Sequence, residues 1–74
     1  MESMSNEVPT LKEITNNARI GKRLRELRMS KGLKMKWVGN QIGISESHVS
    51  LMERGLRSWP PGMESRYLKA IGEL

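Results

Sequence analysis

Glycines divide the middle of the chain into segments that are each too short to form a core alone. Gly32, Gly43 and Gly55 each follow apolar residues at helical spacing, and glycine readily adopts the left-handed conformation with which many helices end. The intervals between them hold about three helical turns each, so every helix must bury its apolar side against the others. No strand alternation, internal repeat or low-complexity tract is present in the sequence. The pattern predicts an all-α bundle with short connections.

Four core helices are expected, over residues 18–30, 34–42, 45–54 and 63–71. A phase break in the apolar pattern near Asn16 separates the first of them from a short N-terminal helical turn, which Thr10 and Glu13 would cap. Residues 1–9 are predicted to form a mobile arm, and residues 10–74 the folded domain. The expected inward positions are Ile20, Leu24 and Leu27, then Leu33, Val38 and Ile42, then Val49 and Met52, and finally Tyr67, Leu68 and Ile71.

Composition narrows the chemistry that the chain can perform. Its 74 residues include one histidine and no cysteine, so neither disulfides nor thiolate metal sites can reinforce the small core. His48 alone makes no metal site, and no acid pair has a spacing suited to general acid/base catalysis. We therefore expect no enzyme, no metal and no cofactor. Without a membrane-length apolar run or a signal peptide, the protein is expected to be cytoplasmic.

Positive charge is concentrated in one part of the chain. The net charge is +5, the sequence pI is about 10.1, and the span from Arg19 to Lys36 contains a single acid, Glu26. A dense basic block suits a polyanion partner, because phosphate contacts release counterions. A solvated helix face would explain the charge equally well.

A helix, a three-residue turn and a second helix, with Gly39 in the first helix and Gly43 opening the turn, match a helix-turn-helix unit. The stretches IGKRLRELRMSKGL, VGNQIGIS and HVSLMERG resemble the Cro/C1-type, or XRE-type, family of bacterial and phage transcriptional regulators. The resemblance covers residues 20–57. It implies a lambda-repressor-like bundle of four to five helices that binds double-stranded DNA at a palindromic operator, as a weak homodimer or as a dimer formed on DNA. A small stand-alone repressor from a phage or mobile element fits the resemblance best, and a truncated N-terminal domain of a longer repressor would look the same.

The family's recognition helix corresponds here to residues 45–54. The resemblance places Ser45, Glu46, Ser47 and Leu51 at base edges, where Glu can accept from the cytosine amino group and an apolar side chain can cover a thymine methyl. From the residues alone, Glu46 is also explained as an acid near a helix N-terminus, and Leu51 as an ordinary exposed leucine. The phosphate contacts implied by the resemblance are Lys34, Met35, Lys36, His48, Ser50, Arg54 and Arg57.

The resemblance also implies an ion pair with a structural role. Arg28 and Glu53 match an ion pair between the first and third core helices, while a phosphate contact for Arg28 and a surface position for Glu53 are the alternatives. The chain departs from the family at Lys34 and Met35, which replace Ser or Thr and Gln, at Trp37, which replaces a polar residue, and at Gly39, which replaces Ala. The loop around Trp59 is also longer than usual.

The competing function is a helix-turn-helix module that binds protein, such as an antitoxin or an RNA polymerase-binding regulator. Contact through Trp37 or the last helix would serve such a role. Basic residues around a polar recognition helix favour DNA, whereas a broad apolar patch would favour protein. The candidate members of that patch are Trp37, Leu51, Leu56 and Trp59.

Overall fold

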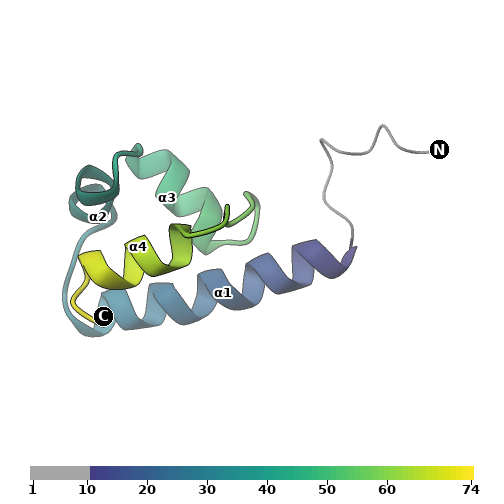
Figure 1. The fold of residues 1–74 in the computed structure, drawn as a ribbon, viewed down its shortest axis with the longest axis horizontal. Coiled ribbons are helices and arrows are strands. Elements are labelled where there is room, and N and C mark those ends of the chain that lie inside the picture. Colours follow the sequence, from purple (N-terminus) through teal and green to yellow (C-terminus); the bar gives the residue numbers. More distant parts are fainter. Residues whose placement is uncertain (1–10) are drawn as a thin grey trace.

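The computed structural model describes residues 11–74, except for the side chains of Glu13 and Ile14, and contains four helices within that range (Figure 1). They are α1 (Leu11–Ser30), α2 (Met35–Ile42), α3 (Glu46–Glu53) and α4 (Met63–Ala70). No strand is present between residues 11 and 74, so the all-α prediction is confirmed. The last three helices lie within one residue of their predicted bounds. None of the helices in this range is long and apolar enough to cross a membrane.

The predicted break near Asn16 is wrong, because α1 is one continuous helix from Leu11 to Ser30. The side of α1 that faces the bundle contains the predicted apolar positions Ile20, Leu24 and Leu27, with Leu24 buried and the other two partly buried against the core. The same side also buries Asn17, Gly21 and Arg28, which an apolar pattern does not reveal. Leu11 is 82% exposed, which shows that the start of α1 needs no core partner at that position.

The predicted mobile arm, residues 1–9, and Thr10 of the expected capping box lie outside the described residues. No outcome for either prediction follows from the structure.

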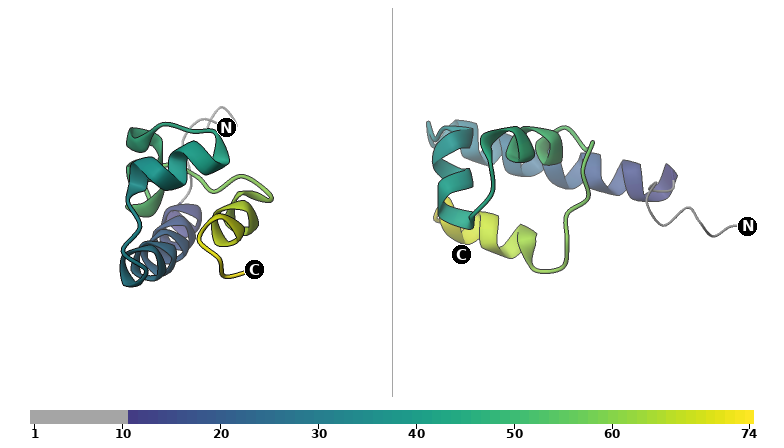
Figure 2. Two further views of the ribbon diagram at one scale, coloured as in Figure 1. Left: turned by 90° about the vertical axis from the view of Figure 1, so that its left-hand side faces the viewer. Right: turned by 90° about the horizontal axis from the view of Figure 1, so that it is seen from above.

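The arrangement of the helices places α1 along the length of the bundle (Figure 1). Its C-terminal half lies beside α4, while α2 and α3 cross above, and its N-terminal end extends past the other helices (Figure 2). All four helices contribute to one core, to which Ile20, Leu27, Leu33 and Leu68 add partly buried side chains. The core consists of Leu24, Val38, Ile42, Val49, Met52, Met63, Tyr67 and Ile71.

The turn between α2 and α3 fixes the relative position of these two helices. Gly43 has φ +81°, a conformation that costs glycine little, and the N–H groups of Gly43 and Ile44 both donate to the Gly39 carbonyl at 2.8 and 2.9 Å. A Cβ atom on Gly39 would lie 2.5 Å from the Ile44 carbonyl oxygen. Glycine at position 39 therefore permits close packing of α2 against the turn.

A second close approach joins α1 to the end of α3. A Cβ atom on Gly21 would lie 2.4 Å from the Glu53 carbonyl oxygen and 2.5 Å from that of Met52. Both obstacles are backbone atoms, so no side-chain rearrangement can relieve the clash. The distance between α1 and α3 therefore depends on the absence of a side chain at position 21.

The variant Gly21→Ala tests this packing. Alanine favours a helix interior over glycine by about 1 kcal/mol, yet overpacking a tight contact costs about 1–3 kcal/mol, occasionally more. Because the clash involves backbone atoms, we expect the free energy of unfolding in urea to fall by about 1–2 kcal/mol. The exposed neighbour Lys22→Ala is the control and should change stability by less than about 0.5 kcal/mol. A Gly21→Ala protein more stable than the parent would show that α1 and α3 are not in tight contact.

Candidate nucleic-acid interface

Helix α3 presents a polar side outward and buries the opposite side. Ser45 is its N-cap, and the Ser45 Oγ accepts a hydrogen bond from the His48 backbone N–H at 3.1 Å. Val49, Met52 and Glu53 are buried, while Glu46 and Ser47 are exposed. The remaining positions, His48, Ser50 and Leu51, are half-buried. The predicted base-contacting residues thus lie at the capped end and along the outer side of one helix.

A groove runs between α1 and α3 and reaches the start of α2. It brings together Met35, Ser50 and Arg54, three of the residues predicted to contact phosphate, with Lys22 and Arg25 of α1. The sequence had included Lys22 and Arg25 in its basic block but had not assigned them to phosphate contacts, because their place beside α3 depends on how the two helices pack. Three cationic side chains and one exposed acid, Glu26, leave the rim of the groove positively charged.

The start of α2 carries the other predicted phosphate contacts. Lys34 is the N-cap and makes no side-chain capping bond, so the first N–H groups of α2 remain available for an anion. Lys34 and Lys36 are exposed, whereas the Met35 side chain is half-buried against the core. A thioether has no donor, so a phosphate contact at Met35 can come only from its backbone N–H. Arg57, exposed beyond the end of α3, completes the set.

A buried network connects α3 to the rest of the bundle. The Arg28 Nε and Nη2 atoms donate to the two Glu53 carboxylate oxygens at 2.8 and 3.0 Å, and the Arg28 Nη1 donates to the Leu33 carbonyl at 2.7 Å. The Tyr67 hydroxyl donates to the same carboxylate. The Glu53 side chain is 1% exposed and that of Arg28 9%. The ion pair expected from the resemblance is present, and it ties α1, α3, α4 and the loop before α2 together.

Comparison with known protein families identifies the domain to which this arrangement belongs. The family model of a helix-turn-helix domain matches residues 19–72. The chain belongs to the helix-turn-helix domain family. No match is found among curated proteins or among solved structures. A helix-turn-helix domain suggests DNA as the partner, with α2 and α3 as its two helices.

The charges in the buried network of the helix-turn-helix domain are fixed by their neighbours. The hydrogen bond to Glu53 raises the pKa of the Arg28 guanidinium, against the lowering effect of burial. Burial, and then the hydrogen bond to Glu53, raises the pKa of the Tyr67 hydroxyl. Arg28 therefore stays charged and Tyr67 stays a neutral donor at physiological pH, so the network keeps one arrangement.

Three further contacts of the domain were not expected from the sequence. The Trp59 indole N–H donates to the Met52 carbonyl at 3.1 Å, and its ring meets that of Tyr67 edge-on with centroids 5.5 Å apart. The Arg66 guanidinium donates to the Ile42 carbonyl at 2.7 Å. The two hydrogen bonds satisfy backbone carbonyls near the C-terminal ends of α3 and α2. The prolines after Trp59 indicated a loop, but they gave no sign that its tryptophan packs inward.

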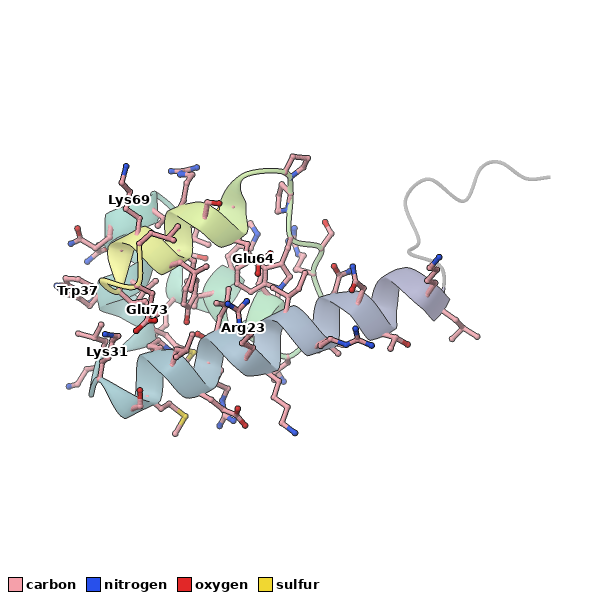
Figure 3. The ribbon with its side chains drawn as sticks, turned by 60° about the horizontal axis from the view of Figure 1, so that its bottom comes forward. Arg23, Lys31, Trp37, Glu64, Lys69 and Glu73 are labelled. Carbon is pink, nitrogen blue, oxygen red and sulfur yellow. The ribbon has the colours of Figure 1, made fainter. Side chains whose placement is uncertain are left out.

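Surface ion pairs of the domain lie apart from this network. Arg23 contacts Glu64 at 2.9 Å and Lys31 contacts Glu73 at 3.1 Å, and Figure 3 shows both pairs joining α1 or its end to the C-terminal part of the chain. Within residues 11–74, no three His, Asp or Glu side chains come close enough to hold a metal ion.

Replacing Glu53 by glutamine should destabilise the domain strongly. The change leaves the buried Arg28 charge without its counterion, and breaking a buried pair costs about 3–5 kcal/mol. Since glutamine keeps one oxygen as acceptor, we expect the free energy of unfolding in urea to fall by about 3 kcal/mol.

The matched control is Glu64→Gln, which breaks the exposed pair with Arg23. That pair should be worth less than about 1 kcal/mol. Equal small losses in the two variants would contradict a structural role for the buried pair.

Proposed function

We propose that the chain is a Cro/C1-type regulator that binds double-stranded DNA sequence-specifically in the cytoplasm and represses transcription, with α3 in the major groove. The observation that supports this most directly is the outer side of α3, where a capped polar helix end lies beside a basic groove. The proposal assigns the chain no catalytic step and no cofactor. A phage or mobile-element repressor of the lambda-repressor-like class fits its sequence best.

Base reading falls to the N-terminal part of α3. Glu46 and Ser47 are exposed there, and a carboxylate in the major groove accepts from the cytosine amino group. The Ser45 oxygen accepts the capping bond, which leaves its hydroxyl proton free to donate to a base. Leu51 is half-buried, so its outer part covers a thymine methyl while its inner part packs on the protein.

Phosphate binding falls to the residues around α3. One DNA strand lies along the groove of Ser50 and Arg54, with His48 on the same helix, and Lys22 and Arg25 of α1 add charge to that contact. The uncapped start of α2, with Lys34, Met35 and Lys36, receives a phosphate on its N–H groups, as helix N-termini commonly do. Arg57 contacts phosphate beyond α3. Such contacts position the protein without reading sequence.

Two copies pair on a palindromic operator, because one short recognition helix covers about one half-site. The last helix offers little area for a tight dimer, since Tyr67 and Ile71 are already buried in the core. The pair is therefore weak without DNA. Sedimentation that found a stable dimer at low micromolar concentration would contradict this.

The rival role, a protein-interaction module, has less support from these side chains. Of the four residues in the candidate apolar patch, Trp59 packs on Tyr67 and Leu51 is half-buried. Trp37 and Leu56 remain exposed, at 42% and 63%. The polar outer side of α3 and its basic surroundings favour DNA as the main partner.

Two substitutions separate base reading from phosphate binding. Glu46→Gln should relax or switch the preference at one base pair of each half-site, by about 1–3 kcal/mol, and leave the salt dependence nearly unchanged. Arg54→Gln should weaken binding to all sequences alike and lower the slope of log K against log salt by about one. The base-pair preference and the salt slope are both measured by equilibrium binding to matched and mismatched duplexes at several salt concentrations.

The control is Lys69→Gln, which removes an exposed charge from α4 and should leave the salt slope unchanged. If Glu46→Gln strengthens binding to every duplex by the same factor, Glu46 is only a repelling surface acid. If Lys69→Gln lowers the salt slope as much as Arg54→Gln does, the phosphate contacts do not follow the groove.

A further inference from the structure

A hollow at the outer side of α2 is not used by the recognition helix. It is lined by Gly32, Leu33, Lys34, Lys36, Trp37 and Asn40, with a volume of about 380 Å³. That volume is at the lower end of the range of about 300–1,000 Å³ for ligand pockets. Figure 3 shows Trp37 projecting outward at one end of the molecule. The hollow has room for one or two side chains of a partner rather than for a folded surface.

The chemistry of this hollow combines an apolar floor with a cationic rim. Leu33 and Trp37 supply the floor, and Trp37 stays 42% exposed. Lys34 and Lys36 supply the rim, and no carboxylate is among the lining residues. A sugar-phosphate strand uses cations but gains little from an exposed indole. An apolar side chain flanked by carboxylates uses both.

The loop that contributes Leu33 to this hollow is held in place before any partner binds. The buried Arg28 guanidinium donates to the Leu33 carbonyl at 2.7 Å, and the Leu33 N–H donates back to the Arg28 carbonyl at 3.2 Å. The loop part of the floor, at Leu33, is therefore held by the same residue that holds α3. A preformed site saves the ordering cost that a flexible loop would add to binding.

We infer that this hollow is a docking site for an acidic segment of a partner protein, which inserts one apolar side chain against Trp37 and places flanking carboxylates on Lys34 and Lys36. The N–H groups at the uncapped start of α2 favour the same negative charge. A segment of this kind takes two lysines that the proposed function gives to DNA phosphates. Docking therefore competes with DNA, and this consequence rests on the proposed function.

The docking itself is tested without DNA. The probe is a synthetic peptide of glutamates around a central leucine and phenylalanine, titrated into the ¹⁵N-labelled full chain. The two tryptophans give separate indole N–H resonances, so Trp59, packed on Tyr67, reports whether the fold is intact. The Trp37 resonance should shift to saturation while that of Trp59 stays unchanged.

Matched variants assign the contacts. Lys34→Gln with Lys36→Gln should weaken peptide binding about tenfold, because two rim charge pairs are lost. Lys12→Gln, an exposed lysine at the other end of α1, should change it less than about twofold. A peptide with glutamine in place of every glutamate should also bind about tenfold more weakly, because the same two pairs are lost.

Competition between the acidic peptide and DNA is measured by comparing the parent chain with the variant Trp37→Gln. Trp37 is no part of the proposed DNA contacts, so this variant should bind DNA like the parent but no longer release it when the acidic peptide is added.

A Trp37 resonance that does not shift when the peptide is added overturns the inference. A resonance that shifts with protein concentration alone also overturns it, because a second copy of the chain would then be the occupant. A shift caused by DNA but not by the peptide overturns it as well. A chain that binds the peptide but no DNA overturns the proposed function and leaves the docking site standing.

Discussion

The buried contact between Arg28 and Glu53 is the interaction on which the other parts of this domain depend. Arg28 lies in the last turn of α1, and its guanidinium reaches the end of α3 and the loop before α2. Two charges removed from water are costly unless every donor and acceptor is satisfied, and here Tyr67 supplies the further hydrogen bond. No buried side-chain nitrogen or oxygen in the described residues lacks a partner. One network therefore sets where both helices of the helix-turn-helix unit lie on the bundle.

This network also gives the surface its rigidity. α2 and α3 have only eight residues each, and isolated helices of that length are not stable in water. Their positions come from tertiary contacts: the close approaches at Gly21 and Gly39, the Trp59 bond to Met52 and the Arg66 bond to Ile42. The outer side of α3 can then meet a partner in one orientation. A recognition helix needs this, because base-edge hydrogen bonds require side chains at fixed places.

Much of the fold could be predicted from the sequence, because glycine caps and apolar spacing act locally. The ends of α2, α3 and α4 followed from such signals. The start of α1 did not, because Leu11 and Ala18 are exposed there, and the phase of exposed apolar residues does not show where a helix breaks. Of the site, the outward position of Glu46 and Ser47 could be foreseen from the helix period. The groove that adds Lys22 and Arg25, and the hollow around Trp37, depend on packing between distant segments and could not.

The role proposed for α3 is to read DNA bases with its capped end, which the buried network holds in a fixed position. The most direct measurement is to select duplexes from a random DNA pool with the full chain and to map the enriched duplex by backbone amide shifts. The predicted result is an enriched palindromic sequence, with the largest shifts at residues 45–51 and at the start of α2, and little change in α4. Selection that enriches no sequence, or shifts that centre on α4, would contradict it.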